Sequence, residues 1–244
     1  MSVIGRVKAM LKSTFPQAVA AYRGVHEAWR RPSLERVFSD IYRTNAWKNP
    51  ESVSGRGSTL ARTQVIISQL PPLLRELGVR TLLDAACGDF NWMRYAELGG
   101  VKYVGADIVP DLVARNRRLY GREGRSFLAL DITKDRLPRA DAVLCRDCLI
   151  HLSFESIAAA VANFKRSGAG HLLCTTHASV TENVPCRDGG WRNVNLHLPP
   201  FNFPPPLKTI VEDAELEKCL GVWRLKDLTA ARPACARRGV QSAS

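Results

Sequence analysis

The stretch TLLDAACGDFNWM, residues 81–93, decides how the rest of the chain is interpreted. It begins as an apolar run, which predicts a strand over residues 80–86. Unbroken apolar character is typical of a strand that is covered on both faces of a parallel sheet. The strand ends in Asp84, and a turn of small residues with a single glycine, Gly88, follows. A carboxylate beside such a turn raises the question of what binds there.

The same pattern continues along the chain. Strands are predicted over 101–107, 126–132, 140–147 and 169–177, and helices over 60–77 (interrupted at Pro71-Pro72), 91–100, 110–120 and 153–168. This alternation predicts an α/β fold with a doubly wound, mostly parallel, seven-stranded sheet. Two extended runs, 199–213 and 218–228, are expected to close one edge as an antiparallel pair.

Four successive strands end at or near an acid: Asp84, Asp107, Asp131 and Asp147. Ligands of open α/β sheets bind beyond the carboxyl ends of the strands, so one ligand with several donors would account for all four. Taken singly, Asp131 and Asp107 could instead cap a turn or the next helix.

A dinucleotide is disfavoured, because the fingerprint of three glycines is missing. Only Gly88 is present, while Ala86 and Phe90 occupy positions where glycines would stand. Asp84 and Asp89 flank the turn, and such carboxylates favour a ligand with positive charge or donors over a diphosphate. This argues against an NAD-dependent dehydrogenase.

The segments LLDAACGDFNWM, YVGADIV and LALDIT resemble the cofactor motifs of class I S-adenosylmethionine (SAM)-dependent methyltransferases. More narrowly, CGDFNWM, with SGRGS upstream and CRDCLIHLSF downstream, is similar to bacterial methyltransferases of unassigned substrate, some of them found near polysaccharide-synthesis functions. The resemblance spans about residues 38–228. It implies a Rossmann-like methyltransferase fold and SAM as cofactor.

The resemblance also implies roles for the strand ends. Asp84 would hold the methionine end of SAM, Asp107 the ribose hydroxyls and Asp131 the adenine amino group. The backbone of the turn and two apolar neighbours complete the expected cofactor site: Ala86, Cys87, Gly88, Ile108 and Ile132. Ala86 is tolerable if its φ is negative, whereas Phe90 could narrow the pocket.

A hydroxyl acceptor needs a base to take its proton, and two candidates follow the fourth strand. Asp147 and His151 are four residues apart, so they would share one face if the segment were helical. His151 has a suitable unperturbed pKa, although a histidine among leucines can also be purely structural. His177, at the end of the fifth strand, is a second candidate. No metal site is expected, because CRDC (145–148) lacks a second cysteine pair.

Segments outside the sheet are expected to bind the acceptor. Residues 189–206 supply aromatic and amide side chains that suit a sugar or other polyol, unless the loop simply packs into the core. The segments NAWKN (45–49) and SGRGS (54–58) are expected to fold over the cofactor as a lid, with Trp47 stacking on it, unless they simply form a surface loop.

The formal net charge is +12, and most of the excess lies near the two ends. We therefore expect three parts: a basic helical extension over 1–37, the methyltransferase domain over 38–228 and a flexible basic tail over 229–244. Residues 3–15 could touch a membrane surface, and no segment is long and apolar enough to span one. Seven scattered cysteines indicate reduced thiols and a cytoplasmic location.

The leading hypothesis is methyl transfer to a small-molecule or glycan acceptor, through a hydroxyl. The basic composition leaves an RNA or protein methyltransferase open, although the charge is terminal rather than central. A cofactor-binding pseudoenzyme or scaffold is the third alternative.

Overall fold

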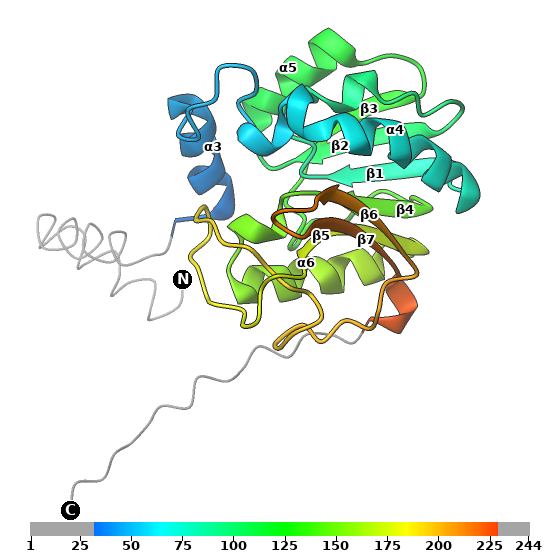
Figure 1. Ribbon diagram of the computed structural model, residues 1–244. Helices are drawn as coiled ribbons and strands as arrows, with labels where there is room; N and C mark the ends of the chain where they lie inside the picture. Colours follow the sequence, from blue (N-terminus) through cyan, green and yellow to red (C-terminus); the bar gives the residue numbers. More distant parts are fainter. Residues whose placement is uncertain (1–31, 229–244) are drawn as a thin grey trace, which may run out of the picture. The chain divides into compact units, whose positions relative to one another are not determined.

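The computed structural model describes residues 32–228, which form a seven-stranded sheet between helices (Figure 1). The strands are β1 Thr81–Ala85, β2 Lys102–Asp107, β3 Arg125–Ala129, β4 Ala142–Cys145, β5 His171–His177, β6 Lys208–Asp213 and β7 Lys218–Arg224. The helices are α3 Leu34–Thr44, α4 Leu60–Glu76, α5 Pro110–Tyr120 and α6 Phe154–Arg166. Short 3-10 turns cover Arg56–Ser58, Met93–Tyr95, Leu149–His151 and Leu225–Asp227.

The strand order is β3-β2-β1-β4-β5-β7-β6. β1 pairs in parallel with both β2 and β4, and the order of the strands reverses beside it. β7 pairs antiparallel to β5 on one side and to β6 on the other. The predicted fold class is therefore confirmed, including the antiparallel pair at one edge.

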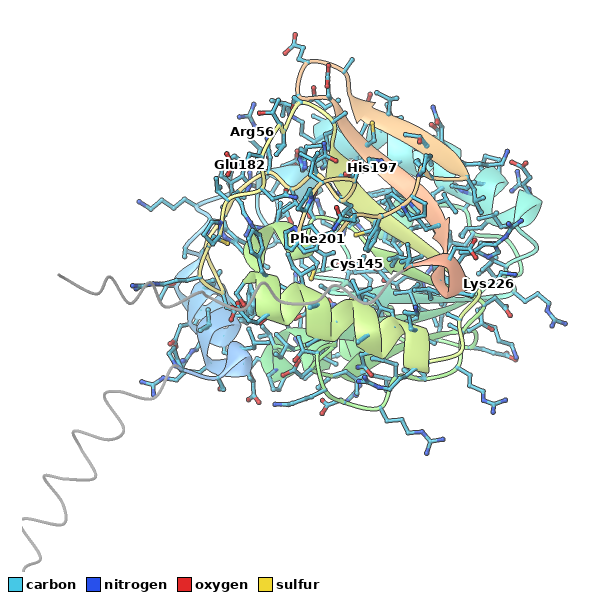
Figure 2. All side chains as sticks on the ribbon, turned by 90° about the horizontal axis from the view of Figure 1, so that it is seen from below. Arg56, Cys145, Glu182, His197, Phe201 and Lys226 are labelled. Carbon is cyan, nitrogen blue, oxygen red and sulfur yellow. The ribbon has the colours of Figure 1, made fainter. Side chains whose placement is uncertain are left out.

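Alternate side chains of each strand enter the two halves of the core. In β1, Leu82 belongs to the cluster that contains Ile66 and Leu70 of α4, whereas Leu83 belongs to the cluster of α6. This two-residue period gives three layers, with α4 on one face of the sheet and α6 on the other (Figures 1 and 2). All four residues of β4 are buried, as the apolar sequence predicts.

Two predicted elements differ from the structure. α4 runs through Pro71 and Pro72 without interruption, because packing of its buried apolar side chains against the sheet outweighs the two lost backbone donors. The helix predicted over 91–100 is only the 3-10 turn Met93–Tyr95. The helix predicted over 153–168 is α6, and Ser153 caps its start: Ser153 Oγ accepts a bond of 3.2 Å from the amide of Ser156.

The predictions for residues 3–15 and for the tail over 229–244 lie outside the described residues. The domain boundary expected at 37/38 lies within α3, and the compact unit of the structure begins at Leu34. Within residues 32–228 no helix is long and apolar enough to cross a bilayer. The described cysteines are all free thiols.

Candidate active site

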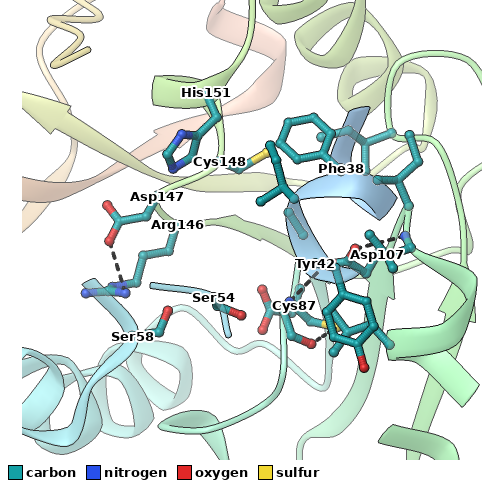
Figure 3. Close-up of a pocket in the computed structure, with 18 of the residues that line it drawn as sticks. Phe38, Tyr42, Ser54, Ser58, Cys87, Asp107, Arg146, Asp147, Cys148 and His151 are labelled. Carbon is teal, nitrogen blue, oxygen red and sulfur yellow. Dashed lines mark hydrogen bonds and ion pairs between the residues drawn. The ribbon is translucent and has the colours of Figure 1, made fainter. Parts of the chain in front are cut away.

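A cavity lies beyond the carboxyl ends of β1, β2 and β4, where the strand order reverses (Figure 3). We call it the first cavity. Ten residues that the sequence predicts for cofactor binding or catalysis line it, whereas His177 does not: Asp84, Ala86, Cys87, Gly88, Asp107, Ile108, Asp131, Ile132, Asp147 and His151. The volume is about 120 Å³, below the roughly 300–1,000 Å³ typical of ligand sites. Outward movement of the side chains of α3 that form one wall would widen it.

The turn after β1 is held by the neighbouring strand. The amides of Ala86 and Cys87 both donate to the carbonyl of Ala106, at 2.8 and 2.9 Å. Ala86 has a φ of +71°, so the condition of a negative φ, under which alanine would be tolerated without strain, is not met. The two bonds to Ala106 hold this alanine in a conformation that normally favours glycine.

Asp84 is a buried acid at the base of the first cavity. Its Oδ2 accepts a bond of 2.7 Å from the hydroxyl of Tyr103. Burial raises the pKa of Asp84 to about 7, and the bond from Tyr103 offsets only part of this effect. A ligand that brought a positive charge to Asp84 would favour its ionised form.

Asp107 and Asp131 end the next two strand segments. Asp107 accepts bonds from the amides of Gly88 (3.0 Å) and Val109 (3.1 Å), and burial raises the pKa of this carboxyl. Asp131 accepts a bond from the amide of Thr133, so it also caps a turn. Both carboxylates still line the first cavity.

Three acids beside apolar side chains fit the cofactor that the resemblance implies. Carboxylates can accept bonds from an ammonium, ribose hydroxyls and an adenine amino group, while Ile108 and Ile132 supply apolar surface.

Two residues that the sequence placed beside the ligand point elsewhere. Asp89 is absent from the first cavity, and its carboxylate instead accepts bonds from Ser52, Val53 and Ser54. Phe90 does not narrow the pocket, because its ring packs in the core against three other aromatic rings. Both differences arise from the turn, whose φ values of +56° at Gly88 and +59° at Phe90 redirect the chain.

The loop with the SGRGS segment, residues 54–58, is fastened over the site by these contacts. Ser54 Oγ accepts a bond of 2.9 Å from the amide of Asp89 and lies where a side chain on Gly88 would stand. A Cβ on Gly57 would lie 2.7 Å from Asp147 Oδ2. The loop therefore needs glycine where it meets the carboxylate. Trp47, Ser54 and Ser58 line the first cavity, as expected for a lid.

Asp147 is not on a helical turn with His151, since its φ is +51°. Its Oδ2 lies 3.2 Å from Arg146 Nη1 (Figure 3). The same oxygen lies 2.6 Å from Lys218 Nζ. Burial alone would raise the pKa of Asp147, but the cations Arg146 and Lys218 outweigh it and hold the pKa at about 2. A carboxylate this acidic is a poor proton acceptor near neutral pH.

His151 lies between two cavities. Its Nδ1 lies 2.7 Å from the carbonyl of Gly190, which can only accept, so Nδ1 carries the proton and Nε2 has the free lone pair. Trp47 packs on the imidazole with ring centroids 5.0 Å apart. Burial lowers the pKa of His151, which keeps the ring neutral.

The second cavity continues from the first and has a volume of about 630 Å³. It shares Trp47, Ser54, Asp147 and His151 with the first cavity. The loop between β5 and β6 contributes Trp191 and Asn193, and His177, the second predicted base, also lines it.

A cluster of four charged residues at this junction was not predicted from the sequence. Arg146 donates to Glu212 at 2.5 Å, and Lys218 lies between Glu212 and Asp147. In the sequence, only the adjacent charges Arg146 and Asp147 after β4 hint at this cluster. Their partners, Glu212 of β6 and Lys218 of β7, lie some seventy residues later in the chain. Among the described residues no group of acids, histidines and cysteines is arranged to hold a metal ion.

A family model described as "Methyltransferase domain" matches residues 83–170. No curated protein matches the sequence significantly.

Several solved structures are similar at a distance. The human N-acetylserotonin methyltransferase in complex with SAM is 15% identical, with a TM-score of 0.45 over 68% of this chain and 51% of that chain. The magnesium protoporphyrin IX methyltransferase of Synechocystis PCC 6803 with bound SAM is 18% identical, with a TM-score of 0.47 over 61% and 78%. An N-methyltransferase of Bradyrhizobium japonicum WM9, with bound S-adenosyl-L-homocysteine (SAH), is 19% identical, with a TM-score of 0.44 over 56% and 73%. The chain thus spans about half of the human protein.

The likeness to methyltransferases rests on the matched model, which covers residues 83–170, rather than on these structures. The matched residues include the strand ends Asp84, Asp107, Asp131 and Asp147 around the first cavity. Residues 83–170, which contribute these strand ends, are therefore similar to a methyltransferase domain.

Proposed function

We propose that the enzyme transfers the methyl group of SAM to a hydroxyl of a small-molecule or glycan acceptor in the second cavity. The observation that carries the proposal is the position of His151, whose neutral imidazole lines both cavities with Nε2 free. Bound SAM supplies an electrophilic methyl group on a sulfonium.

The residues of the first cavity would hold the cofactor. Asp84 would pair with its ammonium, Asp107 would accept from the ribose and Asp131 from the adenine, with Ile108 and Ile132 beside the ring. The backbone of Ala86, Cys87 and Gly88 would shape the turn against the methionine end. Burial by the fastened loop would exclude water and fix the orientation.

His151 would accept the proton of the acceptor hydroxyl at Nε2 as the oxygen forms its bond to the methyl carbon. The Gly190 carbonyl holds the ring in the required tautomer. Asp147, fixed by two cations, would remain ionised and stabilise the imidazolium that forms. The products are the methyl ether and SAH.

The cofactor assignment is tested by thermal unfolding of the full chain. SAM and SAH should raise the melting temperature and NAD should not, and Asp107→Ala should abolish the shift because the ribose loses its acceptor. Stabilisation by NAD but not by SAM would contradict the assignment.

The chemistry is tested with labelled methyl donor and a panel of glycans, small polyols, lipids, RNA and peptides. Transfer to a hydroxyl that His151→Ala slows at least a hundredfold, with unchanged SAM affinity, supports the proposed base. Transfer only to RNA or peptide would contradict a small-molecule or glycan acceptor and favour an RNA or protein methyltransferase. SAM binding without transfer to any acceptor would favour a pseudoenzyme.

A further inference from the structure

Glu212 of β6 has one carboxylate oxygen without a partner. The side chain is 1% exposed and lines the second cavity. Its Oε2 accepts two bonds from Arg146, at 2.9 and 2.5 Å, while Oε1 has no hydrogen-bond partner among the described residues. Leaving a buried oxygen unpaired is costly, so its position on a cavity wall points to a ligand that donates to it.

The charges around Glu212 indicate which kind of donor fits. Arg146 and Lys218 balance Asp147 and Glu212, so the cluster as a whole is neutral. A ligand ammonium would gain no net attraction and would lose hydration on entering. A hydroxyl needs only the free lone pair of Oε1, so the cluster favours a neutral donor.

The remaining walls of the second cavity suit a sugar ring. Trp47 lies at the inner end beside His151, and Trp191 is 66% exposed at the loop between β5 and β6. Aromatic rings can cover the apolar faces of such a ring, and Asn193 offers an amide for further hydroxyls. About 630 Å³ is within the range of pockets that hold small ligands.

We propose that the second cavity binds a sugar-type polyol, with one hydroxyl donating to Glu212 Oε1 and a second hydroxyl placed at His151. This inference rests on the proposed function, because it assigns the methylated hydroxyl to the histidine. It makes Glu212 the residue that selects acceptors with a second hydroxyl.

The binding can be tested in the full chain labelled with 5-fluorotryptophan and saturated with SAH. Fluorine spectra resolve Trp47 and Trp191 of the second cavity, Trp92 of the first and Trp223 of the core, once each signal is assigned by a Trp→Phe variant. The probes are neutral mono- and disaccharides, inositols, hexuronates, spermidine and inorganic phosphate.

We expect at least one neutral polyol to shift Trp47 and Trp191 but not Trp223. Glu212→Gln should weaken its binding about tenfold or more, since an ionised acceptor is lost. The matched control is Asp213→Asn: this neighbouring acid lines the same cavity, but its oxygens already bind Arg62 and the amide of Leu216, so a loss of at most about threefold is expected.

Three results would overturn the inference: no polyol binds, only spermidine or phosphate binds, or Glu212→Gln and Asp213→Asn weaken binding equally. SAH should shift Trp92 in every variant. If it does so while polyols fail, the inference falls and the cofactor assignment stands; if SAH itself fails to bind, the proposed function falls.

Discussion

At the scale of single residues, Gly57 sets how the loop over residues 54–58 meets the carboxylate of Asp147. Gly57 lies so close to Asp147 that only a hydrogen fits at its Cα, and Lys218 and Arg146 hold that carboxylate in place from other sides. The carboxylate therefore cannot retreat without losing an ion pair, and any added atom at Gly57 must displace the loop.

We expect Gly57→Ala to weaken SAM binding and to slow methyl transfer about tenfold or more, because the lid can no longer close on the site. Gly100→Ala is the control, since a Cβ there meets no atom within 4 Å. Calorimetric titration with SAH and initial rates measure both effects. Equal SAH affinities and equal initial rates in the two variants would show that the close contact between Gly57 and Asp147 does not affect binding or methyl transfer.

At the scale of elements, α4 shows that packing can outweigh the local tendency of proline to interrupt a helix. Pro71 is buried beside Leu70 and Leu74, whereas Pro72 is exposed in the middle of the helix. Pro72 therefore costs a backbone hydrogen bond without contributing much buried surface.

Pro72→Ala should raise the free energy of unfolding by about 1 kcal/mol, because it restores an amide donor and a better helix former. Pro110 is the control: it stands in the first turn of α5, where its missing N–H costs nothing, so Pro110→Ala should bring no gain. Urea unfolding measures both. A stability loss in Pro72→Ala would contradict the expected cost of Pro72 to the helix.

The sequence predicted most elements because their signals are local. The apolar run over residues 80–86 predicted β1, and strand-end acids predicted the first cavity. Asp89 and Phe90 were misplaced because positive φ values in the turn rotate their side chains away, and such values are not readable at non-glycine residues.

The second cavity could not be predicted in the same way. Its walls join residues 47–65 to the loop after β5 and to the last two strands. The contacts of Glu212 and Lys218 with Arg146 depend on the register of β6 and β7, which only the folded sheet fixes.

At the scale of the whole molecule, burial of acids around the first cavity makes stability depend on pH. The pKa of Asp84 is about 7 in the folded chain against an ordinary value of 3.8. The folded chain keeps Asp84 protonated to a higher pH than the unfolded chain does. The stability that Asp84 contributes is therefore greatest below about pH 4 and is lost as the pH rises to about 7. Asp147 acts oppositely: its pKa of about 2 gives stability that is lost as the pH falls below about 4.

Asp84→Asn should therefore reduce the loss of stability between about pH 4 and 7, by up to roughly 4 kcal/mol, as measured by urea unfolding across that interval. SAM affinity of the natural chain should rise over the same interval, because the ionised carboxylate attracts the cofactor ammonium. Parallel pH profiles for the variant and the natural chain would contradict the assigned burial effect.

The strand order also constrains how the chain can be made. β7 lies between β5 and β6, so the sheet cannot close until residue 224 has left the ribosome. Until then the nascent chain presents the open edge of β5, with its apolar face uncovered, to any other extended polypeptide nearby. The nascent chain is thus open to aggregation through the edge of β5 until β7 has been added.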